Sequence, residues 1–107
     1  MSDTIEHLLH QRYIYTITTI RTEKDDRSVR CVGWAQNKES AFNIVTHNYG
    51  DINESGYYRY AVVEKIRTGL YCTPDKEFWF DWDEPTKKYC SIDKPKEFEN
   101  IVNFSMG

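Results

Sequence analysis

The fold is decided by the stretch "RYIYTITTIRTEKDDRSVRCVGWAQ", residues 12–36. Residues 12–22 are rich in Tyr, Ile and Thr, which favour a pleated, half-buried strand. The charged run at 23–27 is typical of a turn, and residues 28–36 return as a second strand. The sequence therefore predicts an antiparallel hairpin, from which a sheet can be built.

Regular alternation along the second strand predicts what each of its faces carries. It places Arg30, Val32 and Trp34 on one face. The other face carries Val29, Cys31 and Gly33. Glycine inside a strand indicates a bulge or a close approach of another backbone. Arg30 and Trp34 are therefore expected to share a face.

The rest of the chain supplies helices and further strands. Asn37 is placed to cap a helix through about Tyr49, with Gly50 as its left-handed stop. Strands are expected over 57–66 and 77–83, with a short extended piece at 89–92, and short helices over 3–11 and 95–104. We expect one α+β domain over 1–107, residues 1–11 being an N-terminal helical extension. Its antiparallel sheet of four to five strands has helices packed on one face.

Composition limits the classes of function. The 107 residues are 39% hydrophobic and 29% charged, with a net charge of −3. This charge argues against general nucleic-acid binding, which depends on neutralising phosphates. We expect no membrane association and a cytoplasmic location, because we find no signal peptide or apolar span, and three cysteines without C-x-x-C spacing fit a reducing compartment. Neither a metal site nor a cofactor motif is expected.

The loop "DINESG", residues 51–56, matches the first half of an EF-hand calcium loop. The twelfth position of such a loop must be a bidentate Glu, and here it is Val62. The following residues favour a strand rather than the second helix of an EF-hand. We therefore interpret the loop as a junction in which Asp51 and Asn53 organise turns and Gly56 allows positive φ.

Two constellations could carry chemistry. Asp81, Asp83 and Glu84 offer carboxylates for a metal-dependent hydrolase, although a solvated strand face explains them more simply. No nucleophile has an adjacent base, so we expect no catalytic residues. The second constellation mixes aromatic rings with guanidinium groups and predicts a site where a base stacks and phosphates pair: Arg30, Trp34, Tyr57, Arg59 and Trp79. Ordinary cross-strand pairing is the alternative explanation.

From residue 13 onward, the segments "YIYTITT", "RCVGW", "GYYRYAVVEKI", "FWFDWD" and "NFSMG" resemble a family of small proteins of bacteriophages, prophages and gut anaerobes. The resemblance implies a phage context, in which small accessory proteins counter host defence. It implies no catalytic residues. The residues before Tyr13 depart from the family's usual start.

Three functions follow as hypotheses. The first is a non-enzymatic binding protein that sequesters a small anionic, nucleotide-type ligand, as a homodimer or larger oligomer with pockets between subunits. The second is a protein–protein inhibitor that occludes a host defence protein with its aromatic or acidic surface. The third and least favoured is the small metal-dependent hydrolase.

Overall fold

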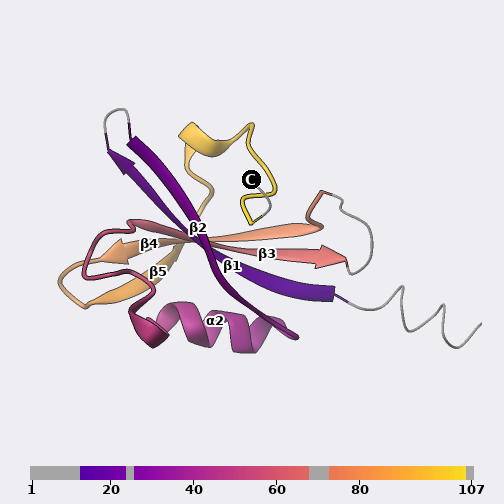
Figure 1. The fold of residues 1–107 in the computed structure, drawn as a ribbon, viewed down its shortest axis with the longest axis horizontal. Helices are drawn as coiled ribbons and strands as arrows, with labels where there is room; N and C mark the ends of the chain where they lie inside the picture. The colour runs from indigo at the N-terminus through magenta and orange to yellow at the C-terminus, as the bar shows by residue number, and fades with distance from the viewer. Residues whose placement is uncertain (1–12, 24–25, 68–72, 106–107) are drawn as a thin grey trace, which may run out of the picture.

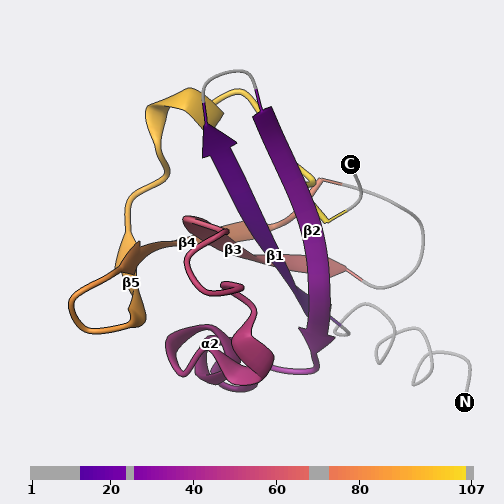
Figure 2. The same cartoon turned by 60° about the vertical axis from the view of Figure 1, so that its left-hand side comes forward.

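The computed structural model describes residues 13–23, 26–67 and 73–105. Their core is a five-stranded antiparallel sheet with the strand order β2-β1-β3-β4-β5. The strands are β1 (Tyr13–Glu23), β2 (Asp26–Ala35), β3 (Tyr60–Arg67), β4 (Lys76–Asp83) and β5 (Lys88–Ile92). The long hairpin β1–β2 crosses β3 and β4 at a steep angle in Figure 2, as the twist of a sheet requires. The small α+β domain expected from the sequence is confirmed.

The single described α-helix, α2 (Lys38–Thr46), follows β2. Asn37 begins it as expected, because its side-chain oxygen accepts the backbone N–H of Ser40 at 2.8 Å. The helix ends earlier than the expected Tyr49, since Asn48 already adopts a left-handed conformation with φ of 49°. A short 3-10 turn, η1 (Tyr49–Asp51), then leads into the loop before β3. The expected helix over 3–11 lies outside the described residues.

Replacing the cap should measurably weaken the domain. We expect Asn37→Ala to lower the free energy of unfolding by about 1 kcal/mol, because the Ser40 N–H loses its acceptor. Urea denaturation followed by circular dichroism measures the change, and Asn37→Asp is the control that keeps an acceptor in place. An Ala variant as stable as the Asp variant would contradict the role of the cap.

Each face of the sheet carries its own core. On the helix face, Ala41 and Val45 of α2 pack against side chains of the central strands, Ile17, Val63 and Phe80 among them. The opposite face, which we call the tail face, is covered over β1, β3 and β4 by the C-terminal segment, residues 93–105. Figure 1 shows α2 and this segment on opposite sides of the sheet. Helix packing therefore accounts for one face only.

The C-terminal segment is not the helix that residues 95–104 were expected to form. Only a 3-10 turn is present, η2 (Lys96–Phe98), and Asn103 has a positive φ of 62° that ends any helical continuation. Phe98 stacks on Trp79 with ring centroids 5.2 Å apart, and Phe104 meets the same indole edge to face at 5.1 Å. Phe98 and Phe104 therefore act as separate anchors on the sheet rather than as parts of a helical stripe.

A buried carboxylate ties this segment to the sheet. Glu64, in the middle of β3, has no exposed surface. Its two side-chain oxygens accept the backbone N–H groups of Phe104 and Ser105, each at 3.0 Å. Burial raises the pKa of Glu64, an effect that the two N–H donors oppose and that the nearby Glu77 reinforces.

A bulge in β2 changes which residues share a face. The register steps from Ile17↔Gly33 to Thr18↔Cys31, so Val32 is an extra residue. Arg30 consequently faces the helix side, and Trp34 faces the tail side. The prediction that Arg30 and Trp34 share a face is wrong. It assumed regular alternation along β2, whereas the bulge, which Gly33 indicated, interrupts this alternation.

Candidate functional site

The five residues predicted to bind a ligand are not gathered into one site. Trp79 is 3% exposed and belongs to the tail-face core. Its indole N–H donates to Glu77 at 2.9 Å. Phe78 and Phe80 lie on the helix face of β4, so Trp79 between them points to the C-terminal segment and is covered by it.

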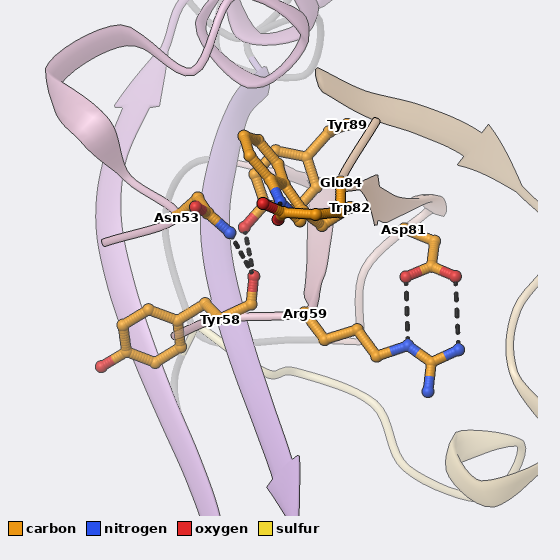
Figure 3. Close-up of polar contacts among 7 residues, drawn as sticks. All are labelled: Asn53, Tyr58, Arg59, Asp81, Trp82, Glu84 and Tyr89. Atoms are coloured by element: carbon orange, nitrogen blue, oxygen red, sulfur yellow. Dashed lines mark hydrogen bonds and ion pairs between the residues drawn. The ribbon is translucent and has the colours of Figure 1, made fainter. Parts of the chain in front are cut away.

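Tyr57 and Arg59 lie before β3, which begins at Tyr60 rather than at residue 57. The guanidinium carbon of Arg21 sits 4.0 Å from the centre of the Tyr57 ring. Arg59 instead makes a two-pronged contact with Asp81 of β4, at 3.1 and 3.4 Å (Figure 3). The bond to Asp81 raises the pKa of the Arg59 guanidinium. These two side chains therefore make separate contacts.

The two predicted residues of β2 also lie apart. Arg30 forms an ion pair with Glu54 in the loop before β3. Trp34 is 60% exposed on the tail side of β2, an edge strand. Val29, 40% exposed, and Cys31 lie on this same side, because their register partners Ile20 and Thr18 do. We call Val29, Cys31 and Trp34 the edge-strand patch.

The three carboxylates of the hydrolase hypothesis each have a different partner. Asp81 pairs with Arg59, and Asp83 accepts the hydroxyl of Thr86 at 2.5 Å. Glu84 pairs with Lys87 and accepts the indole N–H of Trp82, and these bonds lower the pKa of Glu84. Within residues 13–23, 26–67 and 73–105, no group of three His, Cys, Asp or Glu is placed to hold a metal ion. The geometry gives the hydrolase hypothesis no support.

The loop that resembles half a calcium site is held by its own side chains. Asn53 is 1% exposed; its side-chain oxygen accepts the N–H of Gly56, and its amide donates to the Tyr58 carbonyl at 3.1 Å. The Tyr89 hydroxyl donates to the same carbonyl at 2.6 Å, as Figure 3 shows. Burial raises the pKa of this tyrosine, which remains a neutral donor. The expected role of Asn53 in organising the junction is thus seen directly.

A polar cleft of about 300 Å³ lies between this loop and the β4–β5 turn. The loop contributes Asp51 and Ser55, and the strand end and turn contribute Trp82, Glu84 and Lys87. Trp82 packs edge to face on Tyr89, with ring centroids 5.0 Å apart. The sequence analysis did not bring these residues together, because the loop and the turn meet only through the pairing of β3 with β4. A tryptophan next to charged turn residues was the one local signal.

Comparison with protein-family models, with curated proteins and with solved structures finds no significant match to the chain. Among the described helices, none has the length and apolar character needed to cross a membrane. Cys31 and Cys90 are free and exposed. The functional argument therefore depends on the geometry of the chain itself.

Proposed function

We propose that this chain is a non-enzymatic binding protein that recognises a protein partner through its edge-strand patch. The observation that carries the proposal is the 60% exposure of Trp34 on the open face of an edge strand. Tryptophan is among the residues that most often dominate binding energy, because it buries a large rigid area. Val29 and Cys31 extend the apolar surface beside it.

Capture of a nucleotide-type ligand receives less support from the geometry. Such a site needs unpaired cations beside an exposed aromatic ring. Arg30 and Arg59 each already face a carboxylate, and Trp79 is covered. A clustered set of these groups would require rearrangement of both ion pairs and the tail-face core.

The second hypothesis, a protein–protein inhibitor, is the one that the exposed patch favours. A host defence protein as the partner, with a phage context and counter-defence role, is what the family resemblance implies, and it stays a prediction. A second copy of the chain is the competing occupant. Because Arg27, whose register partner is Thr22, lies on the same side of β2 as the patch, we favour a partner with an acidic segment.

Truncating the anchor should remove binding without unfolding the protein. We expect Trp34→Ala to weaken the complex with a purified partner at least tenfold, because the central aromatic contact is lost. Tyr49→Ala is the matched control, since Tyr49 is 55% exposed on η1, away from β2. The partner is first isolated from bacterial lysate, and titration calorimetry then compares the three proteins.

The outcomes separate the hypotheses. Equal affinities for the Trp34 and Tyr49 variants would overturn the assignment of the patch. A sedimentation experiment in which Trp34→Ala converts a dimer to a monomer would identify a second copy as the occupant. A rise in melting temperature with a nucleotide, without any protein partner, would restore the ligand-capture hypothesis.

A further inference from the structure

The cleft between the 51–56 loop and the β4–β5 turn has an excess of negative charge. It is lined by two carboxylates, Asp51 and Glu84, and by one ammonium group, that of Lys87. Lys87 pairs with Glu84, which leaves Asp51 without a cationic partner among the described residues. An anionic ligand would therefore meet repulsion in this cleft, whereas a cation would meet attraction.

Asp51 is held in place by neutral donors. Its Oδ1 atom accepts the side-chain amide of Asn48 and the backbone N–H of Ser55, both at 3.3 Å. Both bonds are long for N–H···O contacts, so they stabilise the negative charge of the carboxylate only weakly. No described residue donates to the other oxygen, Oδ2. The carboxylate thus keeps capacity for a charged donor.

An aromatic wall completes the site. Trp82 lines the cleft, and its ring is held by the bond from its indole N–H to Glu84 at 2.8 Å and by the T-shaped contact with Tyr89. A partly exposed indole attracts organic cations through the negative potential of its ring face. Fixing the ring in advance lowers the entropy lost on binding. An aromatic ring and a carboxylate in one cleft together match an ammonium or guanidinium group.

Lys87 shows how the cleft accommodates such a group. Its ammonium lies on Glu84 with both side chains widely exposed, at 68% and 63%. Exposed pairs of this kind contribute little free energy, so an incoming cation can displace the lysine at low cost. The volume of about 300 Å³ lies at the small end of ligand pockets and suits one cationic head with a short chain.

We propose that this cleft binds an organic cation, a primary ammonium or guanidinium group on a short alkyl chain, between Asp51 and Trp82. The group can be a free small amine or the Lys or Arg side chain of another polypeptide. This site is separate from the edge-strand patch, so it stands or falls independently of the proposed function.

The test is a titration followed by two-dimensional NMR of the full chain. Agmatine is the free cation, a tetrapeptide with one central Arg is the polypeptide source, and adenosine monophosphate is the anionic control. We expect a saturable shift of the Trp82 indole N–H with agmatine or the peptide and none with the nucleotide. A peptide at least tenfold tighter than agmatine assigns the polypeptide source, and otherwise the free amine is assigned.

Asp51→Asn is the decisive variant. Asp51 has φ of 52°, a conformation that Asn adopts readily, and the Asn oxygen can keep both contacts of Oδ1. We expect this variant to fold and to bind the cation at least fivefold more weakly. Glu99→Gln, an equal loss of charge on the exposed C-terminal segment, should leave binding unchanged. No saturable shift with either cation, or an equal loss in both variants, would overturn the proposal.

Discussion

Replacing Glu64 by Ala is expected to lower the free energy of unfolding by about 3 kcal/mol, because one buried and one half-buried N–H group lose their acceptors. These are the backbone donors of Phe104, which is buried, and of Ser105, which is half-buried. Urea denaturation measures the loss, and hydrogen exchange at these two amides localises it. Glu99→Ala, on the exposed part of the same segment, should change stability by less than about 0.5 kcal/mol. Equal effects of the two substitutions would contradict the anchoring role of Glu64.

The same carboxylate makes part of the stability depend on pH. Because burial raises the pKa of Glu64 above 4.5 in the folded state, the folded protein binds this proton more tightly than the unfolded chain does. The linked stability is fully present below pH 4.5 and is lost as the pH rises through the folded-state pKa. Glu64→Gln cannot titrate, so the stability of the wild type relative to this variant should increase as the pH falls through that window. A difference that stays constant with pH would contradict the raised pKa.

The sequence made the sheet predictable because its strands carry local signals. The β-branched and aromatic run of β1, the returning strand β2 and the strand β4 all appear where expected. The apolar run Tyr60–Val63 carries a further signal, which a search for alternating residues does not detect. Four consecutive apolar residues in β3 indicate a strand covered on both faces, and both faces of β3 are indeed covered.

The features that were missed depend on contacts between distant segments. The spacing of Phe98, Ile101 and Val102 suited the apolar side of a helix, yet Val102 is 45% exposed. The path of the segment is instead set by the packing of Phe98 and Phe104 on the sheet. Glu64 gave the only hint of this, as a carboxylate inside an apolar strand that needs donors from elsewhere. The cleft was unpredictable for the same reason, since Asp51 and Trp82 come together only when β3 pairs with β4.

Trp79→Ala and Trp34→Ala should differ strongly in their effect on the free energy of unfolding, although both replace a tryptophan by alanine. Trp79 is 3% exposed and contacts Phe98 and Phe104, so its loss leaves a cavity in the tail-face core. We expect a loss of about 3–5 kcal/mol in the free energy of unfolding. Trp34 is 60% exposed, and its removal should change stability by less than about 0.5 kcal/mol.

Chemical denaturation of the two variants under identical conditions measures both effects. Trp79→Phe serves as a control that keeps an aromatic ring in the core, and it should recover most of the stability lost by the Ala variant. A tryptophan that the chain keeps exposed at little structural cost is free to act in recognition, whereas a buried one is already used in folding. If Trp79→Ala proved as stable as Trp34→Ala, the C-terminal segment would not be packed on the sheet, and Trp79 would again be available to a ligand.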